Sequence, residues 1–517
     1  MLGYRSLRKT RFKKENTVRI RNWFVTAVLV FAGCASAPPE KAIINDAATA
    51  LGGADKIQAV NTLTITGSGE NLNLGQNSSP DAPTPVLKVS EYKRSIDFTG
   101  NRSRLEQVRT ATVGNTAPAK QILGLDGDVA FNVNAAGVAA RASGQVAKDR
   151  RQEMYHHPIG ALRAALAQGA TVANPRKDGN ADVVDITTSD GVKLTLYVDS
   201  QTKLPSKVTT VTDNIGGPLG DMVVETSFAN YADTGGLKLP NRLTTKNDKY
   251  TVADIEVSAN AVNGNAGDLS APADVKSAAA PPAAAPAMIT VEEVGKGLWY
   301  LTGQSHHSVV AEFADHLVLI ETPQHEVRSA AVIAKAKELR PNKPIKYVIN
   351  THHHFDHSGG IRAAIAEGAT IITHEGNKAF IEAMASRPHT LTPDALSKSP
   401  KSAVVETVSD KRVLKDSTRT LEIYHVASSL HSDTMLMVYF PAERLIVEAD
   451  LYNPPAAPAA NAPPPPPNAP PPVFPFAANF VENVHKLGLR VDRIMPIHGR
   501  LVPFKDAEAA SKSASSD

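Results

Sequence analysis

Four side chains within six consecutive residues have the types and spacing to bind a metal ion. His352, His354, Asp356 and His357 form the pattern H-x-H-x-D-H directly after the apolar stretch 345–350. Neutral imidazole and carboxylate groups are preferred ligands of Zn²⁺, which they bind at about 2.0–2.2 Å. Such a metal ion can lower the pKa of a water molecule and polarise a carbonyl group. The pattern therefore predicts a metal site with hydrolytic chemistry.

The elements around this motif are expected to be alternating strands and helices. A strand end would hold the backbone still, and Ser358 to Gly360 would release the chain into a helix. Upstream, periodicity predicts three short strands, one helix and a last strand before the motif. These elements are expected at 299–301, 309–313, 317–320, 328–340 and 345–350. The order favours layered sheets covered by helices.

The motif and the segments after it resemble the metallo-β-lactamase superfamily over about residues 290–505. That fold is an αββα sandwich with two metals at one sheet edge, and it needs three later ligands. Matching positions are His431 in SSLHSDT, Asp450 in LIVEAD and His498 in MPIHG. The resemblance implies a first Zn²⁺ held by His352, His354 and His431, and a second held by Asp356, His357 and His498, with Asp450 shared.

The resemblance also implies an enzyme, a zinc-dependent hydrolase acting on a small-molecule substrate. Hydroxide shared between the metals would attack a carbonyl carbon, with Asp356 and Asp450 as the catalytic carboxylates. Some β-lactamases of this fold carry cysteine where this chain has Asp450. Ala449-Asp450 is more similar to the Gly-Asp of glyoxalase II, lactonases and related esterases. We therefore expect an ester, lactone or thioester substrate, with β-lactam hydrolysis as the alternative.

Two further functions stay open at this point. Some relatives with this fold bind iron and are oxidoreductases, although flavodiiron proteins carry glutamate where this chain has His354. The other alternative is a lipid-binding lipoprotein with a secondary metal site.

Other histidines lie outside this ligand set. The pair 306–307 lies in a connecting segment that passes near the metals in this superfamily, and we take His307 and His389 as candidate substrate contacts. His353 alternates with its neighbours on an extended segment and is expected to pack away from the metals. The pair 156–157 lacks a third ligand and is expected at the surface.

The region before the motif predicts a different, mostly antiparallel β domain. Stretches such as 192–198 alternate apolar and polar residues, as half-buried strands do. The segments 50–56 and 228–240 resemble periplasmic lipoprotein-handling domains of the LolA/LolB kind. An Ala/Pro-rich segment, with a composition typical of an extended linker, then precedes the hydrolase domain. The expected parts are a β-rich domain at 34–267, the linker at 268–289, and the hydrolase domain at 290–517 with a proline-rich loop at 453–476.

The N-terminus is typical of an export signal. Residues 1–33 contain eight Lys/Arg and one acid, followed by an apolar core too short to span a bilayer. Cys34 follows in a context that resembles a bacterial lipobox, so its lipidation would attach the protein to a membrane. We expect a periplasmic or secreted protein, and no disulfide within the chain because Cys34 is its single cysteine.

Overall composition excludes one broad class of partner. The formal net charge is +3, from 55 basic and 52 acidic residues. Without residues 1–33 the chain holds 47 basic and 51 acidic residues, a net charge of −4. A mildly acidic chain has no electrostatic reason to bind nucleic acid.

Overall fold

The computed structural model describes residues 38–112, 116–214, 217–455 and 474–513. The predicted signal peptide, Cys34 and most of the proline-rich loop lie outside these residues. Among the helices described, none has the length and apolar character needed to cross a bilayer.

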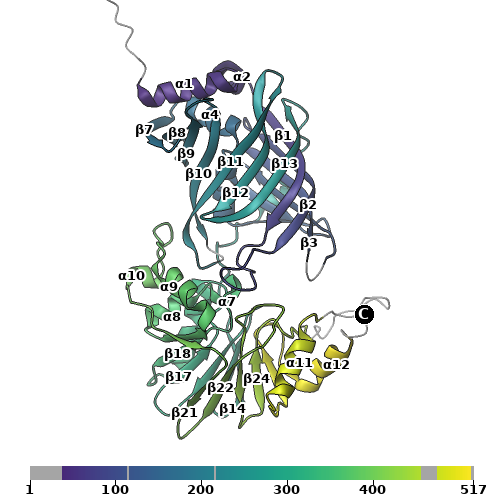
Figure 1. The fold of residues 1–517 in the computed structure, drawn as a ribbon, viewed down its shortest axis with the longest axis vertical. Helices are drawn as coiled ribbons and strands as arrows, with labels where there is room; N and C mark the ends of the chain where they lie inside the picture. Colours follow the sequence, from purple (N-terminus) through teal and green to yellow (C-terminus); the bar gives the residue numbers. More distant parts are fainter. Residues whose placement is uncertain (1–37, 113–115, 215–216, 456–473, 514–517) are drawn as a thin grey trace, which may run out of the picture. The chain divides into compact units, whose positions relative to one another are not determined.

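A 13-stranded sheet occupies the first half of the chain (Figure 1). Every neighbouring pair of its strands is antiparallel, so the predicted β domain is confirmed as a mostly antiparallel sheet. The order across the sheet is β6-β5-β4-β3-β2-β1-β13-β12-β11-β10-β9-β8-β7. The strands are β1 Thr62–Leu72, β2 Val86–Asp97, β3 Arg102–Ala111, β4 Ala119–Asp126, β5 Val129–Val133, β6 Ala139–Arg141, β7 Thr171–Asp178, β8 Ala181–Thr187, β9 Lys193–Asp199, β10 Pro205–Asn214, β11 Gly220–Thr234, β12 Leu237–Asn247 and β13 Tyr250–Val262.

Alternation along the strands accounts for the core of this sheet. In β9, Leu194, Leu196 and Val198 are buried while the residues between them are more exposed. Helices cover the buried face, and their apolar residues join the same cluster. The helix at 158–166 begins with a proline whose missing N–H costs nothing at that position. The helices of this half are α1 Pro39–Leu51, α2 Ala54–Gln58, α3 Gly144–Glu153 and α4 Pro158–Leu166.

The prediction that His156 and His157 lie at the surface is wrong. Both are buried, with 8% and 2% of their surface exposed. The ring nitrogens of His156 lie 3.0 Å from the Thr210 hydroxyl and 2.9 Å from the Thr226 hydroxyl. Two hydroxyl partners satisfy a neutral imidazole without a metal, so this histidine is a hydrogen-bonded core residue.

The Ala/Pro-rich segment 268–289 is partly packed, which differs from the expectation of an extended linker. It contains the short helix α5 Ala273–Ser277. Val275 and Ala271 are buried against Phe131 of β5. Together with an ion pair of 2.6 Å between Lys276 and Asp126 of β4, these apolar contacts hold the first part of the segment on the 13-stranded sheet.

Two smaller sheets form the second half of the chain. The seven-stranded sheet follows chain order, and its last four strands pair in parallel. Its strands are β14 Thr290–Gly295, β15 Leu298–Thr302, β16 Ser308–Glu312, β17 Leu317–Ile320, β18 Ile345–Ile349, β19 Thr370–His374 and β20 Val405–Val408. The six-stranded sheet comprises β21 Lys411–Lys415, β22 Thr420–His425, β23 Leu436–Phe440, β24 Leu445–Glu448, β25 Arg493–Pro496 and β26 Val502–Pro503.

These two sheets pack face to face, and helices cover their outer faces. One apolar cluster lies between the sheets and joins Tyr300 and Val318 to Ile423 and Val438. A second cluster joins the seven-stranded sheet to α6, α8 and α9, and a third joins the six-stranded sheet to α11 and α12. The predicted αββα sandwich is therefore confirmed. The helices are α6 Glu326–Leu339, α7 Phe355–Ser358, α8 Ile361–Glu367, the 3₁₀ helix η1 Glu375–Asn377, α9 Lys378–Ser386, α10 Ala395–Lys398, α11 Ala477–Lys486 and α12 Phe504–Ser513.

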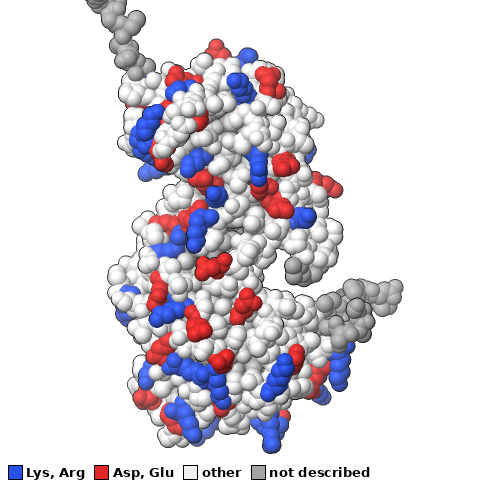
Figure 2. Space-filling model, in the orientation of Figure 1, with Lys and Arg blue, Asp and Glu red and all other residues white. Residues whose placement is uncertain are grey.

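Charged side chains are mixed over the face seen in Figure 2. Basic and acidic residues alternate there, and neither sign dominates a broad area of that face. Long-range fields from such a surface largely cancel.

Candidate metal centre

The histidine-rich turn begins where β18 ends. β18 lies between β17 and β19 and pairs in parallel with both, so its carboxyl end is fixed on two sides. Residues 352–354 follow in extended conformation, and the short helix α7 then carries Asp356 and His357. A Cβ atom at Gly360 would collide with the Ser329 side chain. The glycine pair after the motif therefore lets this turn approach the start of α6 closely.

His352, His354 and His431 form the first group of candidate ligands. One ring nitrogen from each lies within 4.8 Å of the others. His352 Nε2, His354 Nδ1 and His431 Nε2 are buried and have no hydrogen-bond partner. Three converging imidazole nitrogens without partners are costly to bury, and a bound metal ion would satisfy all three. The donor set therefore fits a divalent metal ion.

A second group lies beside the first and contains one residue that the sequence did not indicate as a ligand. His306, Asp356, His357 and His498 also place their candidate ligand atoms within 4.8 Å of one another. His357 Nε2 lies 3.1 Å from His498 Nε2. Two ring nitrogens this close are well placed to bind one ion. The fit to a metal therefore holds for this group as well.

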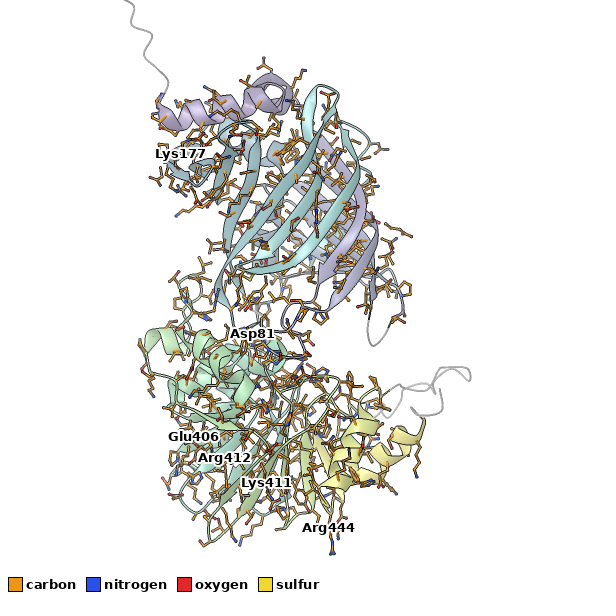
Figure 3. All side chains as sticks on the ribbon, viewed as in Figure 1. Asp81, Lys177, Glu406, Lys411, Arg412 and Arg444 are labelled. Atoms are coloured by element: carbon orange, nitrogen blue, oxygen red, sulfur yellow. The ribbon has the colours of Figure 1, made fainter. Side chains whose placement is uncertain are left out.

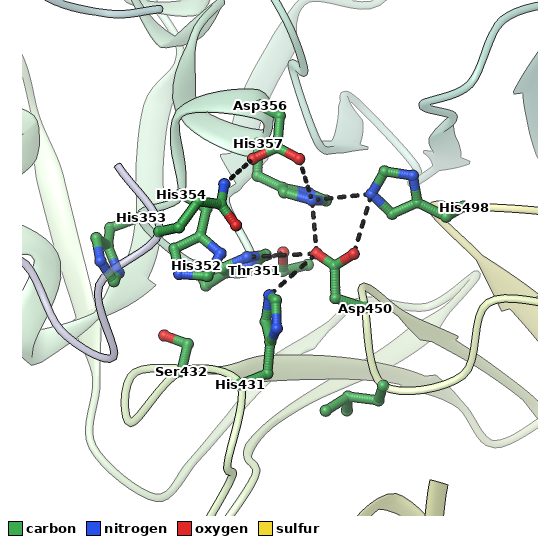
Figure 4. Close-up of polar contacts among 12 residues, drawn as sticks. Thr351, His352, His353, His354, Asp356, His357, His431, Ser432, Asp450 and His498 are labelled. Atoms are coloured by element: carbon green, nitrogen blue, oxygen red, sulfur yellow. Dashed lines mark hydrogen bonds and ion pairs between the residues drawn. The ribbon is translucent and has the colours of Figure 1, made fainter. Parts of the chain in front are cut away.

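Asp450 lies between the two groups (Figure 4). Its Oδ2 atom is 2.7 Å from His357 Nε2 and 3.4 Å from the Nε2 atoms of both His352 and His431. Its Oδ1 atom is 3.1 Å from His498 Nε2. One carboxylate thus reaches ligands of both groups.

The later ligands also come from strand ends. Asp450 follows β24, and His498 follows β25, which pairs in parallel with β24. His431 lies in the connection between β22 and β23. The structure therefore brings all seven predicted ligands to one edge of the sandwich.

Glu321 supports the second group and was missed at the sequence level. This residue directly follows β17 and has a left-handed backbone, with φ of 68°. Its carboxylate is fully buried, and Oε2 accepts a hydrogen bond of 3.0 Å from His357 Nδ1. Oε1 accepts a hydrogen bond of 2.6 Å from the Thr351 N–H. A carboxylate on the far ring nitrogen fixes a histidine's tautomer and orientation for metal binding.

Two residues from the connection between β1 and β2 also contact the centre. Gln76 Nε2 donates to Asp356 Oδ1 over 3.0 Å. His354 Nε2 donates to the backbone carbonyl of Asn77 over 2.8 Å. Both residues are about 280 positions away from the motif in sequence, and no local pattern marks them.

Burial and nearby charges shift the pKa values of these histidines in opposite directions. Burial lowers the pKa of His354 to about 3 and places that of His352 well below its ordinary value. Burial also opposes the charged form of His357, but the carboxylates of Asp450 and Glu321 outweigh it and hold its pKa well above the ordinary value. His352 and His354 are thus held in the neutral form, which is the form that binds metals.

Asp356 is an ionised carboxylate at the mouth of the centre. Burial raises its pKa, but hydrogen bonding by His306 and the nearby charge of His357 lower it further, so the net pKa is below its usual range. Its side chain is 38% exposed. Asp356 is therefore the most accessible carboxylate of the centre.

The predicted substrate contacts lie elsewhere. His307 is buried, with ring nitrogens against the Tyr300 hydroxyl and the Gln304 carbonyl. Its neighbour His306 faces the centre instead and donates from Nε2 to Asp356 Oδ2 over 3.1 Å. Residues 303–306 form a bend, which turns His306 toward Asp356 while His307 contacts Tyr300.

His389 and His353 belong to neither donor group. His389 packs against Gly220, with Nδ1 3.6 Å from Asp394 Oδ2. His353 is buried, with Nδ1 3.4 Å from the Thr434 hydroxyl, on the side that the sequence predicted.

Comparison with known proteins agrees with this architecture. Residues 301–479 match the family model of the metallo-beta-lactamase superfamily. A metallo-beta-lactamase from Hirschia baltica is 17% identical over 44% of this chain and 97% of its own, with a TM-score of 0.33. A metallo-beta-lactamase from Pontibacter korlensis is 16% identical over 44% of this chain and all of its own, with a TM-score of 0.32. The mono-zinc form of FIM-1 from Pseudomonas aeruginosa is 16% identical over 44% of this chain and 96% of its own, with a TM-score of 0.33. A search of curated proteins finds no match.

Residues 301–479 therefore match the metallo-beta-lactamase superfamily, as the sequence predicted. Members of this superfamily are generally metal-dependent hydrolases, the class that the sandwich and its donor groups define. The resemblance of the first region to LolA/LolB domains stays a prediction.

Proposed function

We propose that this protein is a dizinc hydrolase that cleaves an ester, lactone or thioester. The observation that carries the proposal is the position of Asp450, whose carboxylate lies within 3.4 Å of histidines from both donor groups. A carboxylate that reaches both donor groups can bind two metal ions at once. Two zinc ions held there would supply a water of lowered pKa and Lewis-acid polarisation of a carbonyl.

The protein's own residues would orient the reaction. Asp356 has both carboxylate oxygens held, Oδ1 by Gln76 and Oδ2 by His306. A carboxylate fixed in this way at the mouth can accept a hydrogen bond from an incoming water and hold or move its proton. Burial favours the neutral form of His352 and His354, and each presents a ring nitrogen without a hydrogen-bond partner that is available to a metal ion near neutral pH.

The type of substrate rests on position 450. Asp450 offers oxygen where some β-lactamases of this fold offer sulfur, and Cys34 is the chain's single cysteine. This supports ester, lactone or thioester cleavage over β-lactam cleavage. Residues 1–33 further support export, so we propose a periplasmic or secreted enzyme.

A substrate panel with metal analysis tests the proposal. We expect two zinc ions per chain, hydrolysis of esters, lactones or thioesters, and loss of hydrolysis with a chelator. His431→Gln should lose most activity because it removes one of three ligands of the first group. His485→Gln is the matched control, because His485 pairs with Glu508 on the surface. One iron per chain without hydrolysis would refute the proposal, and hydrolysis restricted to β-lactams would refute the substrate assignment.

A further inference from the structure

Residues 73–85 connect β1 to β2 and contact the metal centre through consecutive residues; we call them the β1–β2 loop. Leu74 packs in an apolar cluster with Phe355 and Phe380. The Gly75 carbonyl accepts a hydrogen bond of 3.2 Å from the Phe355 N–H. The Ser78 carbonyl accepts one of 2.7 Å from the Asp433 N–H. The loop thus holds both the histidine-rich turn and the segment that follows His431.

The Asn77 carbonyl determines which nitrogen of His354 is free. A backbone carbonyl can only accept, so His354 Nε2 must carry the proton in their 2.8 Å hydrogen bond. The neutral ring then has a lone pair at Nδ1, the atom that is buried without a partner. This contact gives His354 both the tautomer and the orientation needed at the first donor group.

Gln76 acts on the second donor group. Its amide donates to Asp356 Oδ1, while His306 donates to Asp356 Oδ2. With one donor on each oxygen, the carboxylate plane of Asp356 is fixed. Removing the amide would leave Oδ1 free to rotate toward solvent, because the side chain of Asp356 is 38% exposed.

The β1–β2 loop is itself braced for this role. Gly75 has φ of +83°, and a Cβ atom there would collide with the Phe355 ring. The side-chain amide of Asn77 donates to the Ala82 carbonyl over 2.6 Å, and Asn77 is 6% exposed. Hydrogen bonds across the loop keep the Asn77 carbonyl pointed at His354.

We propose that the β1–β2 loop is a structural part of the metal centre, with Gln76 and Asn77 as positioning residues. The 13-stranded sheet is therefore required for full metal binding and catalysis. A sheet that only tethered the second half of the chain would not be required for either. This inference rests on the proposed metal-dependent function but not on the choice of substrate.

Two pairs of full-length variants test the inference. Gly75→Ala displaces the loop from Phe355, and Gly137→Ala is its control, because Gly137 has φ of +81° but a Cβ atom there would meet nothing within 4 Å. Gln76→Ala removes the amide from Asp356, and Asp81→Ala is its control, because Asp81 lies exposed on the same loop (Figure 3). Circular dichroism verifies that each variant is folded.

The readouts are the affinity for Co²⁺ in competition with a chelator, the visible spectrum of bound Co²⁺, and kcat and KM. We expect Gly75→Ala to weaken Co²⁺ binding about 10- to 100-fold, the range for residues that orient metal ligands. Gln76→Ala should shift the Co²⁺ spectrum and lower kcat about 10-fold with little change in KM. Both controls should match the unaltered protein.

The outcomes separate this inference from the proposed function. If the unaltered protein binds two metal ions and both test variants match their controls in affinity and spectrum, the loop has no positioning role and the inference is wrong. If the unaltered protein itself binds no divalent metal, the proposed function fails first.

Discussion

Replacing Glu321 with glutamine tests how the second donor group is held in place. The carboxylate of Glu321 accepts two hydrogen bonds in a fully buried position, from the Thr351 N–H and from His357 Nδ1. Glutamine has the same volume but only one acceptor oxygen, and its nitrogen carries hydrogens. One of the two buried donors must therefore face another donor.

The size of the effect follows from that lost acceptor. A buried donor left without a partner costs about 1–3 kcal/mol. The Thr351 N–H belongs to the backbone after β18 and cannot move away, so the glutamine oxygen should accept from it. The glutamine NH₂ group would then face the Nδ1–H of His357, whose ring can move. If the cost is carried by metal binding, the dissociation constant rises roughly 5- to 150-fold.

Chelator competition with Co²⁺ measures this change directly. We expect Glu321→Gln to bind the more weakly held ion about 10- to 100-fold less tightly, with kcat reduced in parallel. Glu312→Gln is the control, because Glu312 pairs with Lys343 and Arg340 and belongs to neither donor group. A folded Glu321→Gln protein whose metal affinity stays within about twofold of the unaltered protein would refute this reasoning.

Three further outcomes are expected. Stripping the metal should lower the melting temperature, and adding Zn²⁺ should restore it. At a free Zn²⁺ concentration of 100 times Kd, the added free energy of unfolding is about 2.7 kcal/mol. A melting temperature insensitive to Zn²⁺ would contradict this. Burial lowers the pKa of His156 and of His157 to about 3 in the folded protein. As pH falls below 6.5, the unfolded chain therefore binds protons at these histidines before the folded protein does. Stability should then fall by about 2 kcal/mol per histidine between pH 6.5 and 5, and urea titrations should show a shallower pH dependence for His156→Gln. Asp394→Asn breaks the buried ion pair with Arg362 and should cost about 3–5 kcal/mol in urea unfolding, whereas Asp492→Asn at an exposed pair should cost under about 1 kcal/mol.

Local patterns were sufficient to predict an element where the residues of that one segment determine its structure. The strand before the histidine-rich turn, the helix at 328–340 and the alternation in β9 each depend on neighbours within about ten residues, and the structure has all three. The later positions His431 and Asp450 were found by resemblance, because nothing in their own surroundings shows that they meet the motif.

The direction in which a side chain points was harder to predict than the place of its segment in the fold. The segment with the histidine pair 306–307 was placed near the metals, but His307 was chosen and His306 faces Asp356. His306 lies in a bend that precedes β16, and composition does not determine which of two neighbouring side chains such a segment turns inward. The prediction for His156 failed for another reason: this residue has the polarity of a surface residue, but its ring lies between the hydroxyls of Thr210 and Thr226.

Contacts made across the fold explain what remained hidden. Glu321 is 36 positions from His357, and Gln76 is 280 positions from Asp356. Sequence offers a weak signal for Glu321, a carboxylate directly after a fully apolar strand, and none for Gln76, which has the composition of any polar loop. The difference is physical: a buried charge must have a partner and so indicates that one exists, whereas a loop amide is equally stable in water. Residues that orient ligands from a distant element therefore become visible only once the chain is folded.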